Sequence, residues 1–203
     1  MKKLIKRIYN AFFKKSEEPI NANDLLISKG IIKTGENCEI SNLKVYSHLF
    51  NGQSPNVIIG NDCQILGQIE LQSKEATVII GNRVYIGPNT KIFCRNKIEI
   101  EDDVLISWGC TLIDTNFHSL NFDDRKDDVI DGIKGWSHLK WKGVVDKPTI
   151  IRSKSWIGFN TIINKGVIVE EGTVVACGSV LSGSTEKYTV VGVNPAKFIK
   201  NVE

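Results

Sequence analysis

A repeat of six residues in the C-terminal part of the chain constrains its fold more strongly than any other feature. Counting in sixes from Ile151, the lead residue is aliphatic each time, and a second, mostly small residue follows four places later. The lead residues are Ile151, Ile157, Ile163, Val169, Val175 and Leu181, and the second residues are Ser155, Thr161, Val167, Thr173, Ser179 and Thr185. An amphipathic helix repeats its apolar residues every three or four positions, whereas a period of six suits short strands joined by tight corners. The pattern therefore predicts an all-β fold, a parallel β-solenoid.

The same repeat extends far toward the N-terminus. It begins irregularly near Ile31 and slips out of register at 46–56, 72–77 and 95–98, where a few extra residues are expected to bulge from a corner. We therefore predict one domain with appendages. The predicted segments are an N-terminal helix and linker over 1–30, the β-helix over 31–186 with a loop over 119–148, and a C-terminal tail over 187–203.

The cysteines and the apolar segments indicate the cellular compartment of the protein. The chain has five cysteines, an odd number without paired spacing, which argues against a disulfide framework and for a reducing environment. Cys38, Cys63 and Cys110 fall on small inward positions of the repeat, so we expect them to pack in the core. No apolar run approaches the length of a membrane span, and the N-terminus lacks the apolar segment of a signal peptide. We therefore expect a cytoplasmic protein.

Basic residues gather at the N-terminus. Residues 1–15 carry six of the 26 lysines and arginines and none of the 23 acids, so the rest of the chain has 20 basic and 23 acidic side chains. A mildly acidic body gives no electrostatic reason to expect nucleic acid as a partner.

Residues 2–15 have the pattern of a basic amphipathic helix. Leu4, Ile8 and Phe12 recur at helical spacing, with lysines between them. Two roles stay open. The helix caps the open end of the solenoid, or it makes a peripheral contact with the inner membrane surface, its apolar face in the interface and its lysines on anionic headgroups.

The repeat is interrupted at His118, which stands where an aliphatic residue is due after Leu112. About thirty residues without the six-residue register follow, and a loop of that length in a compact domain is usually functional or disordered. The loop 119–148 contains Trp136 and Trp141, so we expect it to fold onto a ligand or a neighbouring subunit. Its carboxylates lack regular metal-ligand spacing and are expected to be solvated. They are Asp123, Asp124, Asp127, Asp128 and Asp131.

Five motifs accompany the repeat and the long loop. They are Asp114-Thr-Asn-Phe-His118, Trp156-Ile-Gly158, Lys165-Gly-Val167, Gly178-Ser179-Val180 and Gly192-Val-Asn-Pro-Ala-Lys197. Together they resemble the hexapeptide-repeat acyltransferases, most closely the O-acetyltransferases that act on sugars of bacterial surface polysaccharides. The resemblance implies a left-handed β-helix, a homotrimer with active sites between adjacent solenoids, and acetyl-CoA as the acyl donor, bound along the groove between them. It implies no metal.

The chemistry of acyl transfer selects candidate catalytic residues. Transfer from a thioester to a sugar hydroxyl needs a base for the hydroxyl proton and hydrogen-bond donors for the tetrahedral oxyanion. His118 is the expected base, since a neutral imidazole suits proton removal at cytoplasmic pH. Asn116 or Asp114 is expected to fix its tautomer or hold the acceptor, and Asn116 is favoured. The resemblance implies that the backbone N–H of Phe159 stabilises the oxyanion.

Further residues are implied as ligands of the two substrates. For acetyl-CoA they are Trp156, Gly158, Ala176, Gly178 and Lys197, with peptide N–H groups near the glycines and the alanine beside the pantetheine and the lysine on a CoA phosphate. For the acceptor they are Asn116, Trp136 and Trp141, although the two tryptophans equally suit a role in anchoring the loop.

These observations predict an acetyl-CoA-dependent O-acetyltransferase that acts on a saccharide hydroxyl of a capsule, O-antigen or related glycan, by direct attack without an acetyl-enzyme. One alternative is a non-catalytic scaffold of a polysaccharide assembly complex. Another is an acetyltransferase for a small acceptor such as a xenobiotic or an amino sugar. A solenoidal carbonic anhydrase would need three imidazoles on zinc, and His48, His118 and His138 include no close pair, so no metal is expected.

Overall fold

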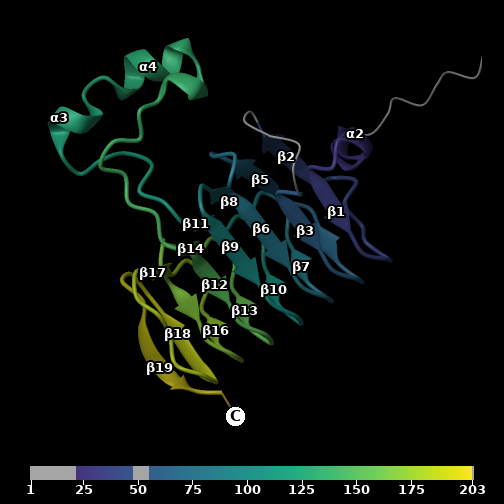
Figure 1. Ribbon diagram of the computed structural model, residues 1–203. Helices are drawn as coiled ribbons and strands as arrows, with labels where there is room; N and C mark the ends of the chain where they lie inside the picture. Colours follow the sequence, from purple (N-terminus) through teal and green to yellow (C-terminus); the bar gives the residue numbers. More distant parts are fainter. Residues whose placement is uncertain (1–21, 48–54, 203) are drawn as a thin grey trace, which may run out of the picture.

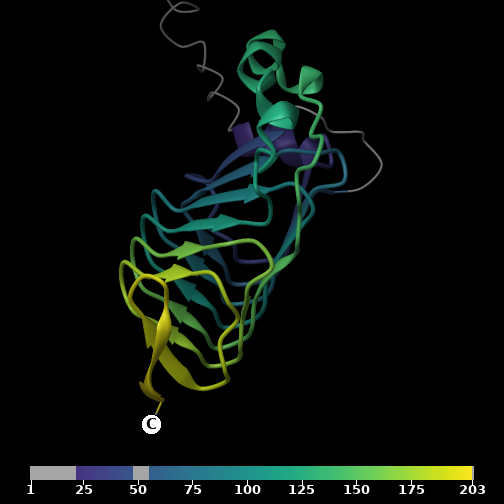
Figure 2. The same ribbon diagram turned by 90° about the vertical axis from the view of Figure 1, so that its left-hand side faces the viewer.

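The chain winds through three sheets of parallel strands stacked along one axis (Figure 1, Figure 2). This computed structural model describes residues 22–47 and 55–202. The predicted helix over residues 2–15 lies outside the described residues. The prediction of an all-β parallel β-helix is confirmed.

From β3 to β17, each coil of the solenoid passes through the sheets, here named A, B and C, in that order. Sheet A contains β1 (Ile32–Thr34), β3 (Val57–Ile59), β6 (Thr77–Ile80), β9 (Lys97–Ile100), β12 (Thr149–Ile151) and β15 (Ile168–Val169). Sheet B contains β4 (Gln64–Ile65), β7 (Tyr85–Ile86), β10 (Leu105–Ile106), β13 (Trp156–Ile157), β16 (Val174–Val175), β18 (Thr189–Gly192) and β19 (Lys197–Asn201). Sheet C contains β2 (Lys44–Ser47), β5 (Gln68–Leu71), β8 (Lys91–Cys94), β11 (Thr111–Ile113), β14 (Ile162–Ile163) and β17 (Val180–Leu181).

The aliphatic lead residues of the repeat form columns along the inside of each sheet. In sheet B, Ile86, Ile106, Ile157 and Val175 follow one another in parallel register, and all are buried. Each such side chain stabilises the fold by about 1.5 to 3 kcal/mol relative to leaving it exposed. One strand and the corner that follows it together take six residues of the repeat, so each strand contributes its lead residue to such a column.

Small residues of the repeat fill the corners of the core and bond to the backbone there. The Thr90 hydroxyl donates to the Ser107 carbonyl over 2.8 Å and accepts from the Cys110 amide over 3.1 Å. Cys63 and Cys110 are buried, as predicted, and Cys38 is half-buried against the edge of the core. All five cysteines are free thiols.

The predicted slips at 72–77 and 95–98 lie at one edge of the solenoid, where a strand of sheet C ends and the next strand of sheet A begins; most of the slip at 46–56 falls outside the described residues. The slip at 72–77 lies between β5 and β6, and that at 95–98 between β8 and β9. The long loop leaves the same edge after β11 and returns at β12. The ladder stays in register on both sides of it, with Ile113 beside Phe93 and Thr149 beside Ile98. Insertions at this edge therefore leave the sheets intact.

The two ends of the described chain close the solenoid differently. At the N-terminal end lies a short helix, α2 (Ala22–Ser28), in the segment predicted as a linker; its Asn23 side chain donates to the carbonyls of Ile40 and Leu43 over 2.6 and 2.9 Å. At the C-terminal end, sheet B continues into the predicted tail, where β18 pairs parallel with β16 and β19 pairs antiparallel with β18. Among the described residues, no helix has both the length and the apolar character needed to cross a membrane.

The long loop forms an arm, residues 115–148, that projects from the solenoid (Figure 1, Figure 2). It carries α3 (Phe122–Arg125), α4 (Asp128–Lys134) and a 3-10 helix, η1 (Trp136–His138). Several large apolar side chains of the arm are exposed. They are Leu120, Phe122, Val129, Ile130 and Ile133.

The base of the arm is anchored to the solenoid through Arg95. Its guanidinium forms an ion pair with Asp146 and lies 4.5 Å from the ring centroid of Trp141. Next to this pair, Thr115 forms an antiparallel bridge with Asp146, and the Asn116 amide donates to the Val145 carbonyl over 3.2 Å. One face of Trp141, predicted to contact the acceptor, is thus occupied by Arg95.

The expectation that the carboxylates of the arm are all solvated is wrong for three of the five. Asp124, Asp128 and Asp131 have side chains only 15, 17 and 11% exposed. Asp124 pairs with Lys142 over 2.6 Å, and Asp131 pairs with two lysines, Lys134 and Lys140. The two lysines lower the pKa of Asp131 below its ordinary value. These pairs hold the short helices of the arm together, which the charge spacing alone did not reveal.

Substituting Asp146→Ala is expected to loosen the arm while leaving the solenoid folded, because it removes the carboxylate that pairs with Arg95. A charge-assisted hydrogen bond is worth about 1.5 to 3 kcal/mol, so trypsin should cleave within the arm about tenfold faster. The measurement is limited proteolysis with mass-spectrometric mapping, with circular dichroism to follow the solenoid. The control is Asp123→Ala, which removes an exposed pair with Lys126. Equal cleavage of the Asp146 variant and the unaltered protein would show that Arg95 does not hold the arm.

Candidate functional site

The His118 side chain lies at the base of the arm, exposed and held by a carboxylate. Its Nδ1 is 2.7 Å from Oδ2 of Asp128, the first residue of α4, and the two side chains are 61 and 17% exposed. A carboxylate accepts a hydrogen bond from Nδ1–H, so the neutral ring keeps its lone pair on Nε2. Asp128 therefore orients the imidazole. The expectation that Asn116 fixes the tautomer is wrong, because Asn116 meets His118 only through its backbone carbonyl, which accepts from the His118 amide over 2.7 Å.

A tight turn at Phe117 sets the position of His118. Phe117 has a φ of 62°, in the left-handed region that costs a residue with a side chain about 1 to 2 kcal/mol. Two contacts offset this cost: the Phe117 amide donates to the Thr115 hydroxyl over 3.2 Å, and its ring meets Phe93 edge-on with centroids 5.5 Å apart. The histidine that follows is consequently directed away from the solenoid core, where the repeat would have placed an aliphatic side chain.

Asp114, the other residue expected to orient His118, points into the solenoid instead. Its buried carboxylate accepts from the amides of Arg95 and Asn96 over 2.8 and 2.7 Å. Burial raises the pKa of Asp114 above its ordinary value, although the two amide hydrogen bonds act in the opposite direction. The expectation that Asp114 serves His118 is therefore wrong: its role is to bind the backbone where the coil below turns into sheet A.

A second group of predicted residues gathers at the corner between sheets B and C. Register pairs there make Pro88, Trp108, Phe159 and Cys177 equivalent residues of successive coils. The carbonyls of Pro88, Trp108 and Phe159 accept hydrogen bonds from amides in the coil above, those of Gly109, Asn160 and Gly178. We call these four residues the corner column.

The corner column leaves its own peptide N–H groups free. Pro88 has none, and among the described residues the amides of Trp108, Phe159 and Cys177 donate to no backbone acceptor. The Phe159 N–H, predicted to stabilise an oxyanion, is thus available as a donor. Its ring stacks face to face on Trp108, with centroids 5.1 Å apart and planes 1° from parallel.

The amides of the three residues expected to border the pantetheine donate to the backbone of the solenoid. The N–H groups of Gly158, Ala176 and Gly178 donate to the carbonyls of Val175, Val191 and Phe159 over 2.9, 2.8 and 2.8 Å. The three residues border the corner column, so the N–H groups near them that remain without a backbone acceptor are those of Phe159 and Cys177. Gly158 also needs to be glycine, since a Cβ would lie 2.7 Å from the Cys177 nitrogen.

Trp156 lies beside this corner on the outer face of sheet B, half exposed, and its indole N–H donates to the Ser107 hydroxyl over 3.4 Å. Two of the three tryptophans predicted to bind substrates, Trp156 and Trp141, are therefore held by neighbouring side chains. Trp136 begins η1 on the arm.

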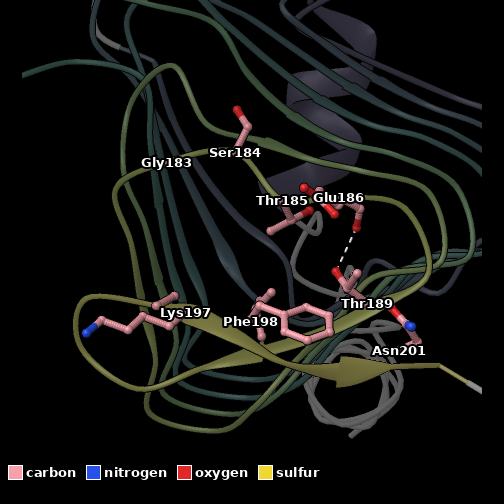
Figure 3. A pocket seen from close by; sticks show the side chains of 10 residues that line it. Gly183, Ser184, Thr185, Glu186, Thr189, Lys197, Phe198 and Asn201 are labelled. Carbon is pink, nitrogen blue, oxygen red and sulfur yellow. Dashed lines mark hydrogen bonds between the residues drawn. The ribbon is translucent and has the colours of Figure 1, made fainter.

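Lys197 stands on β19, where the chain turns back at the C-terminal end of the solenoid. It borders a cavity of about 370 Å³, whose lining includes Thr185, Glu186, Thr189 and Phe198. Figure 3 shows the lysine amine directed away from the hydroxyl and carboxylate groups of this cavity. The Ala196 amide donates to the Val180 carbonyl over 2.8 Å, which fixes the tail to the coil that carries Ala176 and Gly178. The lysine is therefore free to meet a charged group outside the cavity.

The two groups of predicted residues lie at opposite edges of sheet C. The corner column precedes β11, with Trp108 three residues before it, and His118 follows β11 by five residues. The extended segment between them, from Cys110 to Asp114 around β11, spans about 13 Å at about 3.3 Å per residue. One copy of the chain therefore does not bring the His118 ring and the Phe159 N–H together.

Asp128 is the residue of this site that the sequence did not identify. It stands ten residues after His118, in one helix of a loop whose fold has no repeat to predict it. Within residues 22–47 and 55–202, no three His, Cys, Asp or Glu side chains are grouped closely enough to hold a metal ion.

Curated proteins similar in sequence to this chain are acetyltransferases. It is 27% identical over 180 residues to the probable acetyltransferase Rv3034c of Mycobacterium tuberculosis (strain ATCC 25618 / H37Rv), an alignment that covers 89% of this chain and 53% of that protein. It is 44% identical over 52 residues to a probable macrolide acetyltransferase of Lysinibacillus sphaericus, covering 26% of this chain and 29% of that protein. The chain thus spans about half, or less, of the length of these relatives. No family model matches it.

Solved structures share its fold. AntD, an N-acyltransferase from Bacillus cereus in complex with dTDP and Coenzyme A, aligns with a TM-score of 0.67 at 19% identity over 90% of both chains. AntD has also been solved with dTDP-4-amino-4,6-dideoxyglucose and with 3-hydroxybutyryl-CoA. The hexapeptide-repeat acetyltransferase VCA0836 of Vibrio cholerae, complexed with acetyl-CoA, aligns with a TM-score of 0.57 at 18% identity, covering 100% of this chain and 88% of that one.

The three-sheet solenoid, the likeness in sequence to acetyltransferases and the likeness in fold to hexapeptide-repeat acyltransferases confirm the family resemblance that the repeat and its motifs predicted.

Proposed function

We propose that this protein transfers an acetyl group from acetyl-CoA to a saccharide hydroxyl, as part of the synthesis of a capsule, O-antigen or related glycan. The observation that carries the proposal is the exposed His118 ring held through Nδ1 by Asp128. An imidazole with one nitrogen fixed by a carboxylate and the other open to solvent is arranged for general base catalysis.

In the proposed reaction the acceptor oxygen attacks the thioester carbonyl carbon while Nε2 of His118 takes the hydroxyl proton. Asp128 stabilises the imidazolium that forms, and the Phe159 N–H donates to the oxyanion. When the carbon–sulfur bond breaks, the imidazolium returns the proton to the sulfur of CoA. No group of the protein is acylated, so donor and acceptor are bound together.

The donor is proposed to lie along the corner column. Trp156 and Gly158, then Ala176 and Gly178, stand on successive coils toward the C-terminal end, and Lys197 lies beyond them on β19. A chain of these contacts suits a long ligand with its thioester at Phe159 and its phosphates near the lysine. Support comes from the related folds, which have been solved with CoA or acetyl-CoA bound.

The acceptor is proposed to enter beside the arm, where Asn116, Trp136 and Trp141 stand close to His118 in the chain. A specific observation favours a second acceptor class, the amine of an amino sugar. AntD, which shares the fold, is an N-acyltransferase that has been solved with a dTDP-linked amino sugar. The same base serves both, because an amine also loses a proton as the amide forms. Small acceptors such as macrolides, and a scaffold without catalysis, are the remaining alternatives.

The complete site is proposed to form between copies of the chain in a homotrimer. His118 and Phe159 lie at opposite edges of sheet C in one copy, so a second copy must bring its corner column to the arm of the first. The exposed apolar side chains of the arm and the exposed Trp108, Trp156 and Phe159 support such a contact, since both surfaces would lose apolar area to water on association.

The protein is proposed to be cytoplasmic and to contact the inner membrane peripherally through residues 1–15. Six basic and no acidic residues stand there among large apolar ones. A lipid-linked glycan would be the natural acceptor at such a surface.

Release of free thiol from acetyl-CoA, measured against free sugars, glycans and dTDP-linked amino sugars, tests the activity. His118→Ala is expected to lower kcat about 100- to 10,000-fold, as is usual for removal of a general base. Asp128→Asn should lower kcat by a smaller factor and leave KM for acetyl-CoA unchanged. Asp123→Asn, an exposed carboxylate of the same arm, is the control. Unchanged turnover in the His118 variant would exclude it as the base, and no turnover on any acceptor would favour the scaffold.

Phe159→Pro is expected to abolish turnover while the fold persists. The substitution removes the N–H together with the ring, so Phe159→Ala, which removes the ring alone, is its matched control. Proline already occupies the equivalent position at Pro88, followed by Asn89 at φ 60°, as Asn160 follows Phe159 at φ 56°. Phe159→Ala keeps the N–H and should lose far less activity. Co-expression of the His118→Ala and Phe159→Pro chains should restore turnover to about a quarter of the unaltered level if each site joins two copies of a random cyclic trimer. No recovery would mean that both groups act within one chain.

Deletion of residues 1–15 tests the membrane contact. Each base near an anionic surface contributes about 1 kcal/mol, so binding to phosphatidylglycerol vesicles at low salt should fall about tenfold or more in a sedimentation assay. Binding to phosphatidylcholine vesicles is the control. Equal sedimentation of the full chain and the deletion variant would leave residues 1–15 with the role of a cap.

A further inference from the structure

Trp108 stands one coil beyond the proposed reaction centre, on the side away from the donor. Leu105 pairs with Trp156 and Ile106 with Ile157, so Trp108 is the residue of the corner column directly before Phe159. The other neighbour of Phe159 in this column is Cys177, toward the C-terminal end. The column therefore has a direction: Cys177, Phe159, Trp108.

This direction fixes where an acyl group must lie, given the proposed function on which the inference rests. The donor approaches from the C-terminal coils, past Ala176 and Gly178, and places its thioester at the N–H of Phe159. The acyl chain continues from the thioester carbon away from the pantetheine. Its next contact along the column is the position of Trp108.

The indole of Trp108 fills that position and is held there. It is 53% exposed, and its face lies parallel to the Phe159 ring with centroids 5.1 Å apart. The neighbouring Ser107 accepts the indole N–H of Trp156 over 3.4 Å, so a second large ring borders the same coil. A side chain stacked in this way resists displacement, because moving it would expose two aromatic faces to water.

We infer that Trp108 closes the acyl end of the donor site and restricts the enzyme to short acyl groups, acetyl in preference to butyryl. The fold by itself does not decide acyl length, since one solved relative in fold holds acetyl-CoA and another holds 3-hydroxybutyryl-CoA. The choice must therefore be made by side chains that line the path of the acyl group. Filling a site with extra methylenes that it has no room for costs binding, whereas a truncated tryptophan leaves an apolar space that gains from being filled.

The test compares the unaltered protein with Trp108→Ala, Trp108→Phe and Leu105→Ala. Leu105 is an equally exposed apolar residue of the same coil outside the corner column, and Trp108→Phe keeps a ring for the stack. Binding is measured by calorimetry with CoA, S-ethyl-CoA and S-butyl-CoA, thioethers that cannot be turned over. Turnover is measured with acetyl-CoA and butyryl-CoA.

The unaltered protein and the Leu105 variant are expected to bind S-butyl-CoA about tenfold more weakly than S-ethyl-CoA. Trp108→Ala should lose or reverse this difference and raise kcat/KM for butyryl-CoA relative to acetyl-CoA at least about tenfold, with Trp108→Phe between the two. Affinity independent of chain length in the unaltered protein, or the same preference in Trp108→Ala, would overturn the inference alone. Failure of the unaltered protein to bind CoA itself would overturn the proposed function and the inference with it.

Discussion

The hydrogen bonds between equivalent residues of successive coils are the constraint on which the rest of this structure depends. They join strands in parallel register, so that the lead residue of one coil lies on the lead residue of the next, as in the column from Ile86 to Val175. The same bonds decide which backbone groups are left over. At the corner between sheets B and C the carbonyls of Pro88, Trp108 and Phe159 accept hydrogen bonds from the coil above, while the peptide N–H groups of the corner residues have no backbone acceptor in the described chain. Pro88 fits this corner because no N–H is needed there, and at Phe159 the unused donor becomes available for chemistry.

What the sequence predicted follows from what it repeats. A period of six determines the cross-section of the solenoid. That cross-section determines which residues form the core, including the inward cysteines Cys63 and Cys110, and the edge at which the repeat slips. His118 could be identified because it breaks the period. Its partner could not, because Asp128 reaches it through a fold of the arm that depends on side-chain pairing between Asp124 and Lys142 and around Asp131. Charge spacing describes such a loop as solvated until its three-dimensional contacts are known.

The errors at Asp114 and Asn116 have a common physical origin. Both stand next to His118 in the sequence, but the chain changes direction between Asp114 and the histidine as it leaves the sheet. Asp114 still lies within the solenoid and accepts hydrogen bonds from the amides of the coil below. Asn116 already belongs to the base of the arm, where its amide donates to the Val145 carbonyl. Residues close in sequence therefore belong to two different structural units, Asp114 to the solenoid and Asn116 to the arm. Similarly, the amides of Gly158, Ala176 and Gly178 serve the ladder, which a motif alone does not reveal.

The position of the arm separates variation in a long loop from the stability of the domain, two properties that are coupled in most folds. Chain enters and leaves the arm at a single edge, and the strands on either side, β11 and β12, stay paired with β8 and β9 as though nothing had been inserted. Changes in the length and composition of the arm are thus expected to leave the strand pairing of the solenoid intact. A lineage could lengthen, shorten or replace this segment, and with it the histidine-bearing half of the site, while the corner column kept its geometry unchanged. With the acceptor proposed beside the arm and the donor along the corner column, such an arrangement permits acceptors to diversify while the donor-binding surface stays constant.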